Sequence, residues 1–332
     1  MDNLADKDFN RILLLWIGRL GDFIVATPLI NAIRRRFPAA KISLLTAAKA
    51  APLARLDPNI DEVLLLEGAQ KFYLNLPHLF MAARCFDLAV DLNPSYSRAS
   101  LFTILLSMAP VRVSFKKQKP VPAGAYTHLL DHDPDHEHFL DRYGRMAEFF
   151  GADYAPVMKV YPLKDHFEAA VSVLENLHPA PGTKIIGIHP GDFKKYDNRW
   201  PEDNFVEFTK KLLALRGVMP VYFIGPGEEK KIISGILNRL PHGIPYIMPQ
   251  PAGVAAALLG RIDWLVCNNS GMLQLAAAMG TNTFSFDSRY NFKCWRPRGN
   301  NYGIESRQWN SCRDIGIEEA FEAFLKASGL GT

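Results

Sequence analysis

Short apolar runs alternate with longer amphipathic stretches along the first half of the chain. Residues 11–17 read Arg-Ile-Leu-Leu-Leu-Trp-Ile, and the continuous apolar run after the arginine is typical of a strand buried on both faces. Residues 22–37 then place apolar side chains at helical spacing and end in three arginines, which suit the negative end of a helix dipole. The same alternation predicts further strands at 42–46, 62–66 and 86–92, and helices near 47–56, 70–84 and 97–108. This βαβα rhythm indicates a parallel sheet covered by helices on both faces.

The rhythm restarts after the sequence Pro-Ala-Pro-Gly at 179–182. Strands are predicted at 185–188, 221–224, 264–267 and 281–286, with helices at 201–215, before 240 and at 271–279. We therefore expect an α/β protein with two doubly wound, Rossmann-like domains at 1–165 and 166–315. The remaining residues, 316–332, contain a predicted helix with no strand after it, which we expect to pack back on the first domain.

Composition narrows the class of protein. The chain has 332 residues, of which 48% are hydrophobic and 22% are charged, and its net charge is +4. These values exclude a disordered chain and do not indicate a nucleic-acid partner. The four cysteines lack zinc-binding spacing, which favours free thiols in a reducing compartment. Neither a secretory signal nor an apolar run of about 18 residues is found, so we expect a cytoplasmic protein.

The first candidate motif is Gly-Arg-Leu-Gly-Asp at 18–22, directly after the first predicted strand. Its glycines allow a sharp turn and a close approach by a ligand. Two interpretations of Asp22 stay open. It is either a helix cap, or a carboxylate at the edge of the sheet where open α/β sheets bind their ligands.

Three further motifs follow predicted strands in the second half. The first of them is His189-Pro190-Gly191, and it precedes a basic segment whose cations are Lys194, Lys195 and Arg199. A glycine turn beside several cations suits either an anion site or a solvated loop. The second is a predicted helix that starts at Asn269-Ser270-Gly271 and carries Gln274. This helix either presents free backbone amides to a ligand or is an ordinary capped helix. Gly225 and Glu228 follow the strand at 221–224. The four motifs together predict a cleft between two domains that takes a negatively charged ligand.

In order and spacing, these segments resemble bacterial heptosyltransferases, glycosyltransferase family 9. The similarity spans residues 11–38, then Phe86-Asp87-Leu88 with Asp91 and residues 111–115, then 189–205, and lastly the segment that begins at Asn269. The resemblance implies a GT-B fold and an inverting, metal-independent transfer of heptose from ADP-L-glycero-D-manno-heptose, with no cofactor. It implies a lipopolysaccharide inner-core or related glycan acceptor, at the cytoplasmic face of the inner membrane.

The resemblance also implies roles for residues. Asp22 matches the presumed general base, and the segments after Gly191 and from Ser270 match those that hold the donor diphosphate. The chain departs from the family pattern at Asn198, Asn269 and Gln274, where the family usually has Lys, Asp and His. Two alternatives therefore stay open: a GT-B transferase for another nucleotide sugar, and a non-catalytic module that binds a sugar nucleotide.

Acceptor contacts are predicted on the first domain, at Arg19, Gly21, Ser97, Arg98, Lys116, Lys117 and His138. The lysines belong to an irregular segment, 116–138, whose length is typical of a functional loop. Its basic run suits phosphorylated lipid or anionic headgroups, and equally a solvated loop face. Its histidines, at 128, 132, 136 and 138, have mixed spacing, so we expect no metal site.

Overall fold

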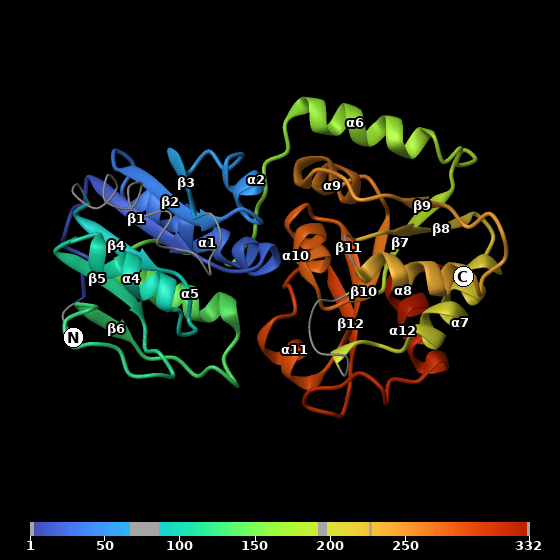
Figure 1. Ribbon diagram of the computed structural model, residues 1–332. Helices are drawn as coiled ribbons and strands as arrows, with labels where there is room; N and C mark the ends of the chain where they lie inside the picture. The colour runs from blue at the N-terminus through green and yellow to red at the C-terminus, as the bar shows by residue number, and fades with distance from the viewer. Residues whose placement is uncertain (1–2, 67–85, 192–197, 226–227, 331–332) are drawn as a thin grey trace. The chain divides into compact units, whose positions relative to one another are not determined.

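The structure is a computed structural model that describes residues 3–66, 86–191, 198–225 and 228–330. The chain divides into two compact units, Met1–Tyr161 (unit 1) and Pro162–Thr332 (unit 2). The division falls four residues before the boundary expected from the sequence, because helix α6 (Lys164–Glu175) packs on unit 2 against α9 (Ala252–Leu259) (Figure 1).

Unit 1 is built on a parallel six-stranded sheet of strand order β3-β2-β1-β4-β5-β6. Its elements in chain order are β1 (Arg11–Trp16), α1 (Leu20–Arg36), β2 (Lys41–Ala47), α2 (Ala51–Ala54), β3 (Glu62–Leu66), β4 (Leu88–Asp91), α4 (Arg98–Leu106), β5 (Val111–Phe115), β6 (His128–Leu130) and α5 (Phe139–Phe149). Strand β1 lies in the middle, with Ile12 opposite Ile42 on one side and Leu88 on the other. Its continuous apolar run is buried as the sequence predicted.

Unit 2 repeats the plan with a second parallel six-stranded sheet, of order β12-β11-β10-β7-β8-β9. After α6 its elements are β7 (Lys184–His189), α7 (Glu202–Leu213), β8 (Val218–Phe223), α8 (Glu228–Leu237), β9 (Tyr246–Ile247), α9, β10 (Trp264–Asn268), α10 (Gly271–Ala278), β11 (Asn282–Asp287), α11 (Arg289–Cys294), β12 (Asn301–Glu305) and α12 (Ile317–Ser328). Two doubly wound parallel sheets confirm the α/β fold class inferred from the sequence.

The core of unit 2 is rich in aromatic side chains. Trp200 and Phe286 stack with ring centroids 3.8 Å apart, and Phe208 packs edge-on against the same Phe286. Helix α12 completes this core, because Phe324 meets Phe208 at 5.5 Å and Trp264 at 5.6 Å. The sequence predicted that this helix packs back on the first domain. The structure differs, since the apolar face of α12 fits the aromatic cluster beside α7 and β12.

Other differences concern short elements. The segment 116–138, expected to be irregular, contains β6, which extends the first sheet at its edge but has only three residues. The helix expected near 47–56 is reduced to the four residues of α2. The helix expected at 70–84 lies outside the described residues. In the part of the chain that the structure describes, no helix combines the length and the apolar character needed to cross a bilayer.

Candidate functional site

Asp22 lies at the switch point of unit 1, between the carboxyl ends of β1 and β4. At this point the strand order reverses, because β1 is followed by β2 on one side and β4 by β5 on the other. Helix α1 begins at Leu20, and its cap position is taken by Arg19, whose side chain makes no capping hydrogen bond. Asp22 is therefore a first-turn residue, half-buried, rather than the cap that one interpretation of the sequence assigned to it. A carboxylate in the first turn is favoured by the helix dipole.

The turn before Asp22 requires glycine. A Cβ atom at Gly18 would come within 2.7 Å of the Trp16 ring. The indole nitrogen of Trp16 in turn donates a hydrogen bond to the Arg19 carbonyl, with Nε1 and O 3.2 Å apart. The Trp16 ring thus fills the inside of the turn and sets the path of the backbone into α1.

Tyr143, on α5, is bonded to the segment after β4. The ring is fully buried, and its hydroxyl donates to the Leu92 carbonyl at 3.1 Å. Burial raises the pKa of Tyr143 well above its usual value, and the negative charge of Asp22 raises this pKa further. Asp22 therefore lies within electrostatic reach of Tyr143, at the same edge of the sheet as the β4 terminus.

A buried ion pair lies beneath this edge. The Asp91 carboxylate, at the end of β4, accepts hydrogen bonds from the Asn93 side chain at 2.8 Å, from Lys117 Nζ at 2.9 Å and from the Tyr126 hydroxyl at 2.8 Å. The side chains of Asp91 and Lys117 are 0% and 2% exposed. Sequence reasoning named Asp91 as part of the family resemblance but did not predict that it pairs with Lys117 and Tyr126, which come from distant segments.

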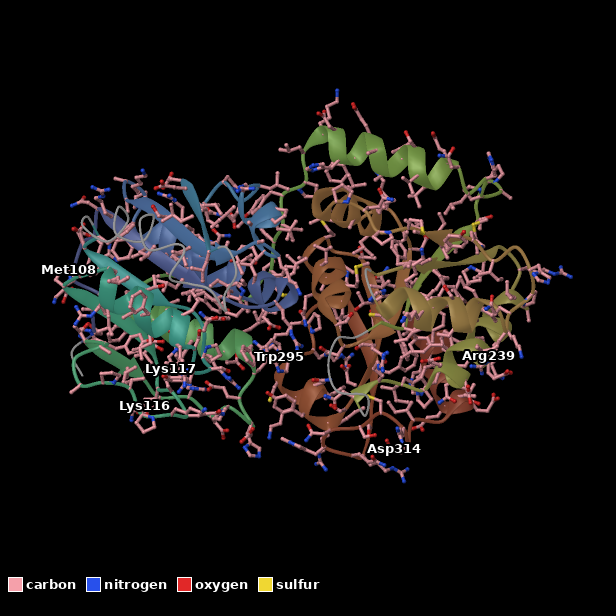
Figure 2. All side chains as sticks on the ribbon, in the orientation of Figure 1. Met108, Lys116, Lys117, Arg239, Trp295 and Asp314 are labelled. Carbon is pink, nitrogen blue, oxygen red and sulfur yellow. The ribbon has the colours of Figure 1, made fainter. Side chains whose placement is uncertain are left out.

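The ion pair corrects one predicted acceptor contact. Lys117 was expected to bind the acceptor, but its ammonium is enclosed by Asp91 and the Asn93 carbonyl and does not face solvent. Its neighbour Lys116 is exposed and pairs with Asp131. Figure 2 labels the two lysines. Arg112 is also used within the unit, because its guanidinium donates to the Ala125 and Gly124 carbonyls. Both lysines thus pair with carboxylates of unit 1, and the Arg112 guanidinium is bound by backbone carbonyls.

The other predicted acceptor residues have diverse surroundings. Arg19 and Arg98 are exposed, and Gly21 is buried in the first turn of α1. Ser97 caps α4 by accepting a hydrogen bond from the Ser100 amide at 3.2 Å. His138 caps α5 in the same way, with Nδ1 3.2 Å from the Leu140 amide.

The four histidines of the irregular segment have separate partners. His128 packs on Phe149, the Nε2 atom of His132 lies 3.0 Å from the Lys116 carbonyl, and His136 pairs with Asp133. Burial lowers the pKa of His132. Within the described residues, no group of three or more histidine, cysteine or acidic side chains is arranged to hold a metal ion.

In unit 2 the switch point lies between β7 and β10, and two of the sequence motifs meet there. Gly191 and Pro190 follow β7, and Asn268 ends β10. The Asn268 side chain joins the two segments: its Nδ2 donates to the Pro190 carbonyl at 2.7 Å, and its Oδ1 accepts from the Trp200 amide at 2.9 Å. The fully buried Asn268 therefore ties Pro190 and Trp200, the residue after Arg199, to the end of β10.

The start of α10 carries the third motif. Ser270 holds the cap position without a capping hydrogen bond from its side chain. Asn269 donates from Nδ2 to the buried Asp287 carboxylate at 2.7 Å, and Ser285 donates to the other oxygen of Asp287 at 2.5 Å. Gln274 donates to the Trp295 carbonyl at 2.9 Å. The amides of the first turn of α10 thus lack the side-chain cap that would otherwise occupy them.

Several buried polar atoms of unit 2, on α10 and on other segments, have no hydrogen-bond partner among the described residues. They are Ser270 Oγ, Gln274 Oε1, Asn198 Oδ1 and both amide atoms of Asn291, on α11. Native structures contain few such atoms, and a bound ligand or water often supplies the partner. Asn291 is a residue that sequence reasoning missed, because no strand-end motif marks it.

The remaining donor candidates are less fully described. His189 is buried at the end of β7, and its Nδ1 lies 3.0 Å from the Phe223 carbonyl, so that nitrogen carries the proton. Gly225 is buried just after β8. Lys194 and Lys195 lie outside the described residues, as does the side chain of Glu228.

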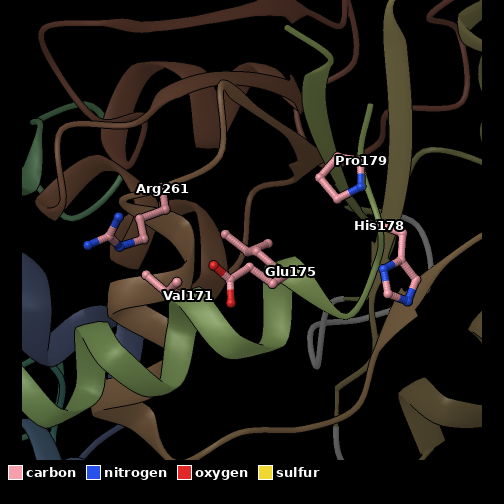
Figure 3. A pocket seen from close by; sticks show the side chains of 6 residues that line it. Val171, Glu175, His178, Pro179 and Arg261 are labelled. Carbon is pink, nitrogen blue, oxygen red and sulfur yellow. The ribbon is translucent and has the colours of Figure 1, made fainter. Parts of the chain in front are cut away.

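Two grooves on unit 2 lie away from the switch point. One, of about 510 Å³, is lined by Val171, Glu175, His178 and Arg261 near the end of α6 (Figure 3). The other, of about 580 Å³, lies at the beginnings of the strands, beside Lys184 and Trp264. Parallel α/β sheets bind ligands at the carboxyl ends of their strands, so we place the candidate site at the motifs instead.

The two doubly wound parallel sheets place the protein in the GT-B fold class, and comparison with known proteins gives its family. The model of glycosyltransferase family 9 (heptosyltransferase) matches residues 81–323. The chain belongs to this family and is a glycosyltransferase.

Solved structures share the fold over nearly the whole chain. A family 9 glycosyltransferase from Veillonella parvula aligns with a TM-score of 0.83 and 17% identity, covering 98% of this chain and 99% of the other. The E. coli ADP-heptose lipopolysaccharide heptosyltransferase II aligns with a TM-score of 0.77 and 17% identity, covering 96% and 98%. A Haemophilus influenzae protein, named by inference as a glycosyltransferase, is 23% identical over 334 residues, which cover 94% of this chain and 88% of that protein.

Proposed function

We propose that this enzyme moves a heptose from ADP-L-glycero-D-manno-heptose to a hydroxyl group of the lipopolysaccharide inner core, with inversion at the transferred sugar. The observation that carries the proposal is the position of the motifs. Asp22 lies at the switch point of unit 1, and the segments at 189–191 and 268–271 lie at the switch point of unit 2. An E. coli heptosyltransferase of the same fold, with a TM-score of 0.72, was solved with ADP.

The proposed chemistry is a single displacement. Asp22 accepts the proton of the acceptor hydroxyl, whose oxygen attacks the anomeric carbon as the bond to the nucleotide diphosphate breaks. Attack from the face opposite the leaving group inverts the configuration. The proposal includes no metal and no cofactor, so protein groups must stabilise the departing diphosphate. The uncapped amides of α10 and the guanidinium of Arg199 are suited to this task.

We assign the nucleotide sugar to unit 2 and the acceptor to unit 1. Candidate acceptor contacts are the exposed Arg19, Arg98 and Lys116, together with Ser97 and His138. The proposal places the work of the enzyme at the cytoplasmic face of the inner membrane, where the acceptor is assembled, and includes no nucleic-acid partner. Because Lys117 and Arg112 are used inside unit 1, the proposal gives them no contact with lipid headgroups.

The test is transfer measured with ADP-heptose and a lipopolysaccharide-core acceptor for the native chain and for Asp22→Asn. Removing a general base should lower kcat by about 10²- to 10⁴-fold, while the affinity for ADP stays unchanged. Asp165→Asn is a matched control, because Asp165 is an exposed carboxylate in the first turn of α6. Full activity of Asp22→Asn would remove Asp22 as the base.

Donor identity is tested by thermal shift with ADP, UDP and GDP. We expect ADP to stabilise the protein most. Preference for UDP or GDP would favour a transferase for another nucleotide sugar, consistent with the departures at Asn269 and Gln274. Binding of ADP-heptose without turnover in the native chain would favour a non-catalytic module.

A further inference from the structure

The turn that carries Asp22 is attached to the neighbouring strand through the amide side chain of Asn93. Asn93 follows β4 and is 6% exposed. Its Oδ1 accepts a hydrogen bond from the Ile17 backbone amide at 3.3 Å, and its Nδ2 donates to Asp91 at 2.8 Å. The same Nδ2 lies 3.2 Å from Ser100 Oγ at the start of α4. One side chain thus joins the ends of β1 and β4 with the first turn of α4.

The partners of Asn93 are themselves held in place. Asp91 also accepts the Asn93 backbone amide at 3.1 Å, and it shares its second oxygen with Lys117 and Tyr126. Lys117 donates to the Asn93 carbonyl as well. A buried carboxylate that is paired with a cation and fully hydrogen-bonded has one favoured arrangement. The Asn93 amide is therefore oriented, with its oxygen toward Ile17.

A displacement at Ile17 would be transmitted to Asp22. Only Gly18 and Arg19 separate Ile17 from α1, and Arg19 is held by the Trp16 indole. Gly18 lies directly over the Trp16 ring, so the turn has little room to absorb a shift. Asp22 belongs to the first turn of α1, and most residues of that helix are buried, so a shift of the turn before α1 displaces Asp22 as well.

We propose that Asn93 is a positioning residue for glycosyl transfer, acting through the Ile17 amide to hold the carboxylate of Asp22 where the acceptor hydroxyl binds. The inference rests on the proposed role of Asp22 as general base. General-base catalysis depends on a hydrogen-bonding distance between base and hydroxyl, and a displacement of about 1 Å can cost on the order of 100-fold in rate. Asn93 itself needs no contact with either substrate.

The experiment is a double-mutant cycle of Asn93→Ala and Asp22→Asn, measured as kcat at saturating donor and acceptor. We expect Asn93→Ala to lower kcat by about 10- to 100-fold, with the affinity for ADP unchanged in calorimetry. In the Asp22→Asn background, Asn93→Ala should cost less than about twofold, because a residue that acts through Asp22 has nothing left to position. An equal loss in both backgrounds would mean a general structural role and would overturn the inference.

Ser114→Ala is the matched control. Ser114 is fully buried on β5 and donates to the backbone carbonyl of Asp91 at 3.0 Å. Among the described residues, no hydrogen bond joins the Ser114 side chain to the turn before α1. Its kcat should stay within about twofold of the native value. A loss equal to that of Asn93→Ala would show that any change around Asp91 lowers the rate, which contradicts a specific role for Asn93.

A charge exchange covers the case in which Asn93→Ala does not fold. Asn93→Asp keeps the acceptor for Ile17 but sets two carboxylates against each other, and kcat should fall. Adding Asp91→Asn exchanges amide and carboxylate, keeps one charge for Lys117 and should restore most of kcat. A folded double variant as slow as Asn93→Asp would overturn the inference. Full activity of Asp22→Asn alone would instead refute the proposed base, whatever the Asn93 variants do.

Discussion

Lys116 and Lys117 are neighbours in sequence, and the structure predicts opposite outcomes when each is replaced by methionine. Lys117 is 2% exposed and lies 2.9 Å from Asp91, which is 0% exposed. Lys116 is 55% exposed and lies 2.5 Å from Asp131, which is 77% exposed. Methionine keeps the length and the apolar stem of lysine, so the substitutions chiefly remove the charge.

The loss at Lys117 comes from the charge that is left behind. Removing one partner of a buried ion pair typically costs about 3–5 kcal/mol. Asp91 keeps its hydrogen bonds from Asn93 and Tyr126, so we expect the lower end, about 3 kcal/mol. In a domain of this size each kcal/mol lowers Tm by about 2–4 °C, which gives a decrease of about 6–12 °C. Lys116→Met should cost about 0–1 kcal/mol, since an exposed pair contributes little.

Calorimetry of the full chain, following the transition of unit 1, measures both variants. Adding Asp91→Asn to Lys117→Met removes the stranded charge and should recover most of the lost Tm. Small and equal shifts for Lys116→Met and Lys117→Met would refute the reasoning. They would mean that Lys117 reaches solvent, and its predicted role as an acceptor contact would have to be considered again.

Three further predictions concern other positions. Asn268→Ala leaves the Pro190 carbonyl and the Trp200 amide without a partner, which costs about 1–3 kcal/mol for each group. We therefore expect ADP to bind more weakly in calorimetry. An unchanged affinity for ADP would mean that Pro190 and Trp200 do not support the donor site. Gly18→Ala should lower both Tm and kcat, because the added Cβ meets the Trp16 ring. The control is Gly235→Ala on α8, where no atom lies within 4 Å of the added Cβ, and this variant should raise Tm slightly. Similar changes in Tm for the two variants would contradict the packing described at Gly18. Burial opposes ionisation of Asp61, but hydrogen bonds from the Ile42 amide and Arg34 outweigh it and lower the pKa of Asp61. The stabilising effect of the Asp61 carboxylate is therefore present above its ordinary pKa and lost as pH falls through the lowered pKa. The Tm values of the native chain and Asp61→Asn should differ at neutral pH and converge once the pH is below that lowered pKa, and a difference that does not change with pH would contradict this role of Asp61.

The sequence alone predicted the parts of this protein that depend on local pattern. The apolar run at 11–17 indicated a buried strand, and the polar segments that follow such strands marked Asp22, His189 and Asn269 as candidates. The strand inference succeeded because a strand covered on both faces needs a continuous apolar run. The three residues stay predicted site residues, chosen because parallel α/β sheets bind their ligands at the carboxyl ends of strands. Strand β6 escaped prediction because three edge residues are too few to show a period.

Contacts between distant residues were decided by tertiary structure. Asn93 meets Ile17 across 76 positions and Asn268 meets Trp200 across 68, and no local pattern specifies either pair. Lys117 looked like part of an exposed basic run until the strand order put Asp91 beside it. Helix α12 was amphipathic by sequence, but only the aromatic cluster of unit 2 determined where its apolar face packs. Hydrophobic periodicity fixes which face of an element is buried, whereas strand order and register decide what that face, and each buried polar group, will meet.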